Sequence, residues 1–98
     1  MIKIEKTEAF AAWFRRLRDL AGRVRIEARI LRLGLGNPGQ HRVLQGGIVE
    51  LKVDYGPGYR VYYTHRKGRV ILLLCGGDKR SQQKDILMAR TLAAGLEE

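Results

Sequence analysis

Residues 48–75 constrain the fold most, because they read as three consecutive strands joined by tight turns. Ile48 to Tyr55 alternates between apolar and polar residues, which is the period of a strand with one buried face. Gly56-Pro57-Gly58 follows as a three-residue turn, Tyr59 to His65 continues as a strand, and Arg66-Lys67-Gly68 turns again. The run from Arg69 to Cys75 is nearly all apolar, as expected of a central strand covered on both faces. This centre predicts an antiparallel sheet.

A short strand and two helical patterns precede this centre. Ile2 to Glu5 alternates like a strand, and Thr7 is a candidate N-cap for a helix. The apolar face of that helix carries Phe10, Trp13, Phe14, Leu17 and Leu20. Gly22 allows a break, after which a second helix has an apolar stripe of Val24, Ala28, Leu31 and Leu35. The arginines of this second helix form either a solvated face or part of a cationic surface.

The remaining elements complete an α+β domain. His41 to Gln45 predicts a short strand that stops at Gly46-Gly47, and Ser81 is a candidate cap for a last helix. One side of that helix carries Ile86, Ala89, Ala93 and Leu96. The predicted order is β-α-α-β-β-β-β-α, a single domain over residues 1–98 in which an N-terminal helical hairpin packs on a mostly antiparallel sheet.

The charge of the chain favours a polyanionic partner. Nineteen Lys and Arg against ten Asp and Glu give a net charge of +9, which suits nucleic acid, a ribosome surface or an acidic protein. The single Cys75 excludes an internal disulfide, so we expect a buried thiol and a reducing cytoplasm. We expect neither a signal peptide nor a membrane span, since no apolar run reaches the roughly 18 residues that a span needs.

The turn at Gly56-Pro57-Gly58 permits an argument about which side chains share a face. If Tyr55 pairs with Tyr59, Asp54 lies opposite Arg60 and Lys52 lies opposite Tyr62. These four residues then occupy a polar face, whereas the core face carries Val49, Leu51, Val53, Val61 and Tyr63. If the second turn closes at Lys67-Gly68, Arg60 lies opposite Cys75, and Lys79 and Arg80 leave the sheet near Arg60.

The polar face is the candidate site for chemistry. Arg60 can donate two hydrogen bonds to a phosphate and stays charged, although it could instead pair with Asp54. Lys52 could neutralise phosphate, act as a base or remain a solvated lysine, and Tyr62 could stack on a base or simply pack. Gly76-Gly77 could offer N–H groups to an anion, although glycines also end strands for steric reasons. No His, Cys and carboxylate cluster has metal-ligand spacing, so we expect no metal or cofactor.

Two motifs make the chain resemble the RelE/ParE toxin superfamily, most closely its HigB-like "addiction module killer" branch. They run from Glu50 to Tyr62 and from Leu72 to Lys79, and Gln82-Gln83 and Asp85-Ile86 follow the second motif. The resemblance implies a RelE-like fold and a toxin of a type II toxin–antitoxin system that cleaves mRNA on the translating ribosome. It also implies neutralisation by a helix-turn-helix antitoxin encoded beside it, through which alone the complex would bind operator DNA.

The same resemblance suggests roles for individual residues. Arg60 matches the arginine that binds the scissile phosphate, Lys79 or Arg80 matches a second cation, and Lys52 matches a strand cation. We therefore expect Arg60, Lys79 and Lys52 to be catalytic, and we expect the RNA contacts to come from Arg80, Tyr62 and Lys84.

The last helix departs from the RelE pattern. It reads Lys84-Asp85-Ile86-Leu87-Met88 and lacks the tyrosine that RelE has there, while neither His41 nor His65 stands in its place. The general acid and base therefore stay open. ParE-like members share the fold but poison DNA gyrase without cutting RNA, so a gyrase inhibitor is the alternative. A degenerate toxin that acts only as an antitoxin-binding partner is another.

Overall fold

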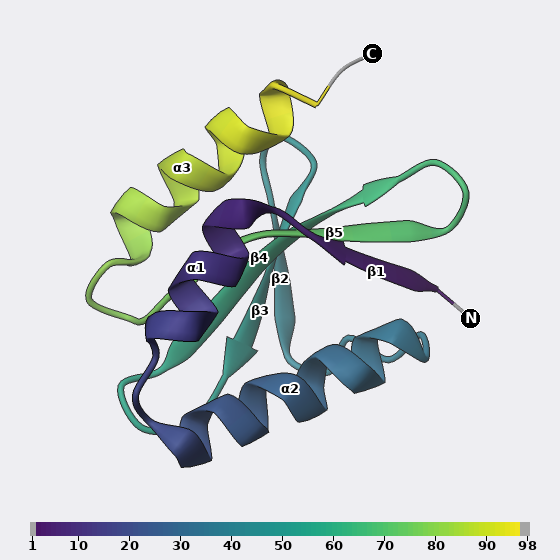
Figure 1. Ribbon diagram of the computed structural model, residues 1–98. Coiled ribbons are helices and arrows are strands. Elements are labelled where there is room, and N and C mark those ends of the chain that lie inside the picture. The colour runs from purple at the N-terminus through teal and green to yellow at the C-terminus, as the bar shows by residue number, and fades with distance from the viewer. Residues whose placement is uncertain (1, 97–98) are drawn as a thin grey trace.

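A five-stranded sheet with the strand order β1-β5-β4-β3-β2 forms the centre of the protein (Figure 1). The computed structural model describes residues 2–96. The elements are β1 (Lys3–Lys6), α1 (Glu8–Arg16), α2 (Leu20–Gly34), β2 (His41–Leu44), β3 (Ile48–Val53), β4 (Tyr59–Arg66), β5 (Val70–Gly77) and α3 (Gln82–Ala94). Strand β1 is parallel to β5, and the other neighbouring strands are antiparallel. The predicted element order and the α+β class are confirmed.

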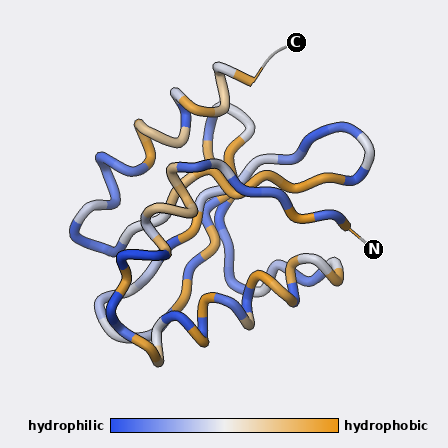
Figure 2. Tube along the Cα trace, in the orientation of Figure 1, coloured by the Kyte–Doolittle hydropathy of each residue, from blue (hydrophilic) through white to orange (hydrophobic). Residues whose placement is uncertain are grey.

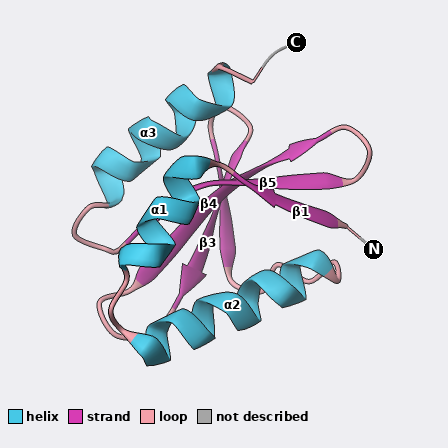
Figure 3. Cartoon of the chain, viewed as in Figure 1, coloured by secondary structure: helices cyan, strands magenta, loops and turns pink. Residues whose placement is uncertain are grey.

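Helices cover both faces of the sheet. Figures 1 and 3 show α2 on one side of the strands and α3 on the other, while α1 crosses near β5. Helices α1 and α2 share a core with the predicted core face of β3 and β4, formed by Phe10, Ile26, Leu33, Val49, Leu51, Val53, Tyr59, Val61, Tyr63, Ile71 and Leu73. Helix α3 closes a second core of Ile48, Tyr62, Leu72, Leu74, Cys75 and Ala89. Strand β5, orange over most of its length in Figure 2, contributes to both cores, as its apolar sequence predicted.

The break between the first two helices lies earlier than the sequence suggested. Thr7 caps α1 as predicted, because its side chain accepts a hydrogen bond from the backbone N–H of Phe10. Helix α1 ends at Arg16, and Asp19 caps α2 by accepting from the N–H of Gly22. Gly22 is therefore helical, and a Cβ at this position would lie 2.6 Å from the ring of Tyr59. The glycine is needed for close packing and not for a helix break.

The apolar stripe identified in the sequence of α2 is not the side of the helix that packs on the sheet. Its core-facing side carries Ile26, Ile30 and Leu33, whereas Val24, Leu31 and Leu35 of the predicted stripe are exposed. The helix has apolar residues on two sides, so its own periodicity does not decide which side packs on the sheet. No helix within residues 2–96 is both long and apolar enough to cross a membrane.

The hairpin register differs from the predicted one by two residues. Lys52, not Asp54, lies opposite Arg60, and Glu50 lies opposite Tyr62. On the other side of β4, Arg60 lies opposite Gly77 and Tyr62 lies opposite Cys75, before an irregularity between Tyr62 and Tyr63. A shift of two residues leaves every side chain on its predicted face, because the strand period is two.

Gly76 and Gly77 extend β5 and make room for side chains on both faces. A Cβ on Gly76 would overlap the ring of Trp13, and a Cβ on Gly77 would overlap the carboxylate of Asp85. The steric explanation of this pair therefore holds. Cys75 is buried beside them, as predicted, and burial raises the pKa of its thiol to about 12.

Candidate functional site

A polar pocket of about 360 Å³ opens between β2, β3, β4 and the start of α3. It is lined by Gln40, His41, Arg42, Glu50, Lys52, Arg60 and Gln82. The sheet register builds it, because Lys52 lies opposite Arg60 and Arg42 lies opposite Glu50, and opposed residues project from the same face. Three cations and one carboxylate thus converge from three strands.

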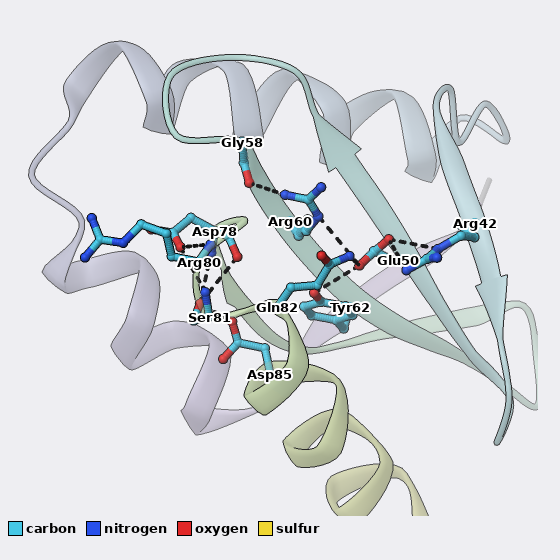
Figure 4. Close-up of polar contacts among 10 residues, drawn as sticks. All are labelled: Arg42, Glu50, Gly58, Arg60, Tyr62, Asp78, Arg80, Ser81, Gln82 and Asp85. Carbon is cyan, nitrogen blue, oxygen red and sulfur yellow. Dashed lines mark hydrogen bonds and ion pairs between the residues drawn. The ribbon is translucent and has the colours of Figure 1, made fainter.

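Glu50 is the centre of the contacts in this pocket (Figure 4). Its Oε1 faces Arg42, whose Nε and Nη2 both lie at 3.2 Å. Its Oε2 accepts hydrogen bonds from the hydroxyl of Tyr62 at 3.1 Å and from Nε2 of Gln82 at 2.8 Å, and it lies 3.7 Å from Nε of Arg60. Glu50 is only 4% exposed, so its carboxylate is an internal counter-charge that ties α3 to the sheet.

Arg60 is held at both ends of its guanidinium. The Nη1 group donates to the carbonyl of Gly58 at 2.7 Å, and the Nε group faces Glu50. Among the residues drawn in Figure 4, no hydrogen bond or ion pair is marked at the second terminal nitrogen. Gly58 has a φ of +82°, and a Cβ there would lie 3.1 Å from Nη1 of Arg60 and 3.5 Å from Cβ of Lys79. The Gly-Pro-Gly loop therefore packs against both Arg60 and the Cβ of Lys79, although Lys79 is not among the residues that line the pocket.

The charges of the pocket favour an anionic ligand. Like charges directly opposed across two strands, such as Lys52 and Arg60, are destabilising. Glu50 is the carboxylate among the residues that line the pocket, and it already faces Arg42 and Arg60. The pocket keeps an excess of positive charge, which a phosphate group could neutralise through charge-assisted hydrogen bonds.

Arg29 fixes the end of β3 from the other side of the sheet. Its guanidinium donates to the carbonyls of Lys52, Pro38 and Gln40, with the last two distances at 3.0 and 2.9 Å. Partial burial lowers the pKa of Arg29, yet arginine remains charged at any physiological pH. This arginine belongs to neither a solvated face nor a ligand site, because it joins α2 to the segment that carries Lys52.

The other predicted RNA-contacting residues lie differently. Tyr62, which was predicted to contact RNA, is 0% exposed, so its ring is not accessible to a base. Burial, followed by the charge of Glu50 and the hydrogen bond to it, raises the pKa of Tyr62 and keeps it protonated. Arg80 points away from Arg60 in Figure 4, and Lys84 is exposed on α3 outside the lining of the pocket.

The predicted polar face is less exposed than a polar pattern suggests, because α3 covers it. Asp54 is exposed, and the carboxylate that faces Arg60 is that of Glu50 and not that of Asp54. No role in the site was assigned from the sequence to Glu50, Arg42 or Gln82, although Glu50 and Gln82 fall in or beside the two motifs. The signal for Glu50 was present, since it lies two residues before Lys52 on the polar face. Arg42 could be placed in the site only once the register of β2 was known, and Gln82 only once the position of α3 was known.

The start of α3 is organised by a separate network. The carboxylate of Asp78 accepts from the backbone N–H groups of Arg80 at 2.9 Å and Ser81 at 3.2 Å. The hydroxyl of Ser81 donates to Asp85, whose pKa is raised chiefly by burial. Ser81 occupies the N-cap position but makes no capping bond to the helix. These contacts fix the loop that carries Lys79.

The two histidines are exposed and lie on the face of the sheet opposite to the side chain of Arg60. His41 pairs with Leu51, and His65 pairs with Ile71, so both project from the opposite face of the sheet. His41 contributes to the rim of the pocket, and its Nδ1 contacts the carbonyl of Gly39 at 2.7 Å. Within residues 2–96, no group of three or more His, Cys, Asp or Glu is placed to hold a metal ion.

Known proteins share both the sequence and the fold. An uncharacterized protein of Haemophilus influenzae is 45% identical over 95 residues, which cover 97% of this chain and 96% of that protein. A chain in the crystal structure of the intact E. coli RelBE toxin–antitoxin complex superposes with a TM-score of 0.63 and 19% identity, covering 80% of this chain and 96% of that one. This likeness confirms the predicted RelE-like fold. The model of the family described as Phage derived protein Gp49-like (DUF891) matches residues 12–93, and the chain therefore belongs to that family.

Proposed function

We propose that this protein is the toxin of a type II toxin–antitoxin system in the HigB-like branch, and that it cleaves mRNA on the ribosome in the cytoplasm without a metal ion. The observation that carries the proposal is the pocket in which Lys52 and Arg60 oppose each other beside Arg42. Membership of the Gp49-like family and a fold like that of a RelBE chain support the toxin assignment.

The pocket suits transesterification of an RNA phosphodiester. The 2′-hydroxyl would lose its proton to water as its oxygen attacks the adjacent phosphorus, and the bond from phosphorus to the 5′-oxygen would break. The leaving 5′-oxygen would take up a proton from water, which gives a 2′,3′-cyclic phosphate and a 5′-hydroxyl. Arg60 would bind the non-bridging oxygens, which gain charge in the phosphorane, and Lys52 would add a second positive charge. Lys79, beside Gly58, would steady the leaving 5′-oxygen.

Purified protein, translating ribosomes and a defined mRNA test this proposal. Because Arg60 is 6% exposed and faces Glu50, alanine would disturb the fold as well as the site, and Arg60→Lys is the cleaner change. It keeps one charge but loses the fork of two N–H donors. Lys52→Met changes a half-buried residue without leaving a buried charge. Each variant should lose about two orders of magnitude in cleavage rate, or about 3 kcal/mol of transition-state stabilisation.

Lys3→Met is the matched control, since Lys3 is an exposed strand lysine on β1 and should leave the rate unchanged. Full cleavage by folded Arg60→Lys and Lys52→Met would contradict the site. If the wild type leaves mRNA intact but blocks supercoiling by DNA gyrase, the ParE-like alternative replaces the nuclease. Neutralisation by a co-expressed helix-turn-helix protein tests the antitoxin partnership independently of the target.

A further inference from the structure

Helix α2 carries a row of exposed apolar side chains along its outer face. Leu20, Val24, Leu31 and Leu35 are 72%, 65%, 68% and 65% exposed. Their spacings of four, seven and four residues place them on one side of the helix, and we call these four residues the outer stripe. The stripe spans about 22 Å at the rise of an α-helix. The core of the protein takes Ile26 and Leu33 from the other side of the helix, and the four residues of the outer stripe belong to neither core.

A groove continues the outer stripe toward the sheet. It has a volume of about 320 Å³ and lies between α2 and the edge strand β1. Leu31 and Leu35 form one wall, and the remaining lining is Ile2, Ile4, Glu27, Ile30 and Gly34. Apolar side chains laid on the stripe would therefore meet a concave apolar floor and not a flat surface.

The borders of the stripe differ in net charge. Arg25 and Arg32, seven residues apart and both exposed, lie on the flank away from the groove, while the groove side carries both Arg23 and Glu27, whose charges offset each other. The guanidinium of Arg25 stacks over the ring of Tyr55 at 4.3 Å, which restricts its position. Two copies of this +9 chain would bring cationic surfaces together, so the complement is not a second copy but an acidic surface.

We propose that the outer stripe and its groove dock an amphipathic helix of a partner protein, with carboxylates on the flank that meets Arg25 and Arg32. The inference rests on the proposed function only for the partner's identity, which would be the antitoxin. The docking face lies across the sheet from the pocket of Arg60, because α2 and α3 cover opposite faces (Figure 1). Partner binding and phosphate chemistry are therefore separable by mutation.

Fluorescence anisotropy with labelled peptides tests the docking surface. The probe is a helical peptide of about 16 residues, with leucines spaced as in the outer stripe and glutamates along one flank. Two matched peptides carry lysines in place of the glutamates, or serines in place of the leucines. The wild-type protein should bind the glutamate peptide. It should bind each of the two matched peptides at least about tenfold more weakly. Val24→Ser with Leu31→Ser should weaken glutamate-peptide binding at least about tenfold, and both residues are exposed, so the fold should persist.

Charge reversal makes the test specific. Arg25→Glu with Arg32→Glu should switch the preference from the glutamate peptide to the lysine peptide. Leu87→Ser, which removes an exposed leucine of α3, is the control and should leave binding unchanged. Unaltered binding by the stripe variant, or an unaltered preference after charge reversal, would overturn the proposal. So would a wild-type dimer in sedimentation equilibrium that the stripe variant abolishes, because a second copy would then be the occupant.

One further variant separates the two proposals. Arg60→Lys should keep full peptide binding while it loses RNA cleavage, and weakened peptide binding would contradict the separation of the two faces. If the wild type cuts no RNA but the peptide results hold, the docking surface stands and the nuclease assignment fails. If the wild type cuts RNA but the stripe variant binds the peptide normally, the nuclease assignment stands and the docking surface fails.

Discussion

Removing the carboxylate of Glu50 should destabilise the fold more than any exposed charge does. Glu50→Ala would leave the buried guanidinium of Arg60 without its counter-charge and the hydroxyl of Tyr62 without its acceptor. Removing one partner of a buried ion pair costs about 3–5 kcal/mol, and a domain has only about 5–15 kcal/mol in total. The separation of 3.7 Å between Arg60 and Glu50 is long, and Arg42 remains solvated, so the lower end applies.

A loss of about 3 kcal/mol corresponds to a fall in Tm of about 12–24 °C for a domain of this size. Glu50→Gln keeps the shape and one acceptor oxygen, so about half of that loss is expected, since only the charge-assisted part disappears. Glu8→Ala is the matched control. It breaks an exposed ion pair with Arg15 at 3.2 Å and should cost less than about 1 kcal/mol.

Thermal and urea unfolding followed by circular dichroism measure all three variants. If Glu50→Ala does not fold, Glu50→Gln still supplies a free energy of unfolding. A Glu50→Ala protein as stable as the Glu8→Ala control would refute the reasoning, because the contacts of Glu50 would then contribute nothing to the fold. The same result would remove the argument that Glu50 holds Arg60 in place.

Four further outcomes are expected. Gly76→Ala should lower stability by about 1–3 kcal/mol in urea unfolding because of the overlap with Trp13, whereas Gly95→Ala, where a Cβ finds ordinary contact distances, should not. Burial raises the pKa of Tyr59 from 10.0 to about 12, so the stabilising effect of its protonated hydroxyl is complete below pH 10.0 and is lost as the pH rises through about 12. Between these two pH values the free energy of unfolding of Tyr59→Phe should therefore fall less than that of the wild type. Iodoacetamide should leave Cys75 unmodified in the native protein at pH 8, as mass spectrometry would show. RNA cleavage should survive EDTA and weaken steeply with salt in a gel assay, and restoration by divalent metal after an EDTA block would contradict the mechanism.

The faces of the strands were predictable from the sequence because strand periodicity is local. Val61 and Tyr63 are buried on the α2 side, and Lys52 and Arg60 share the other side, as their alternation indicated. The register was two residues off, which preserves the face but changes the partner of Arg60 from Asp54 to Glu50. The loop between β3 and β4 determines that register, and its conformation depends on contacts such as the bond from Arg60 to the carbonyl of Gly58.

The sequence by itself determined the order of the helices and strands along the chain, the α+β class and the placement of cationic residues near the Gly-Pro-Gly loop. Only the tertiary structure decided which side of α2 is buried, because both sides are apolar and the sheet can cover only one. It also decided that α3 covers the polar face, which turns Tyr62 from a candidate RNA contact into a buried partner of Glu50. Periodicity reports the two faces of an element, but which neighbour covers each face depends on contacts between residues far apart in the chain.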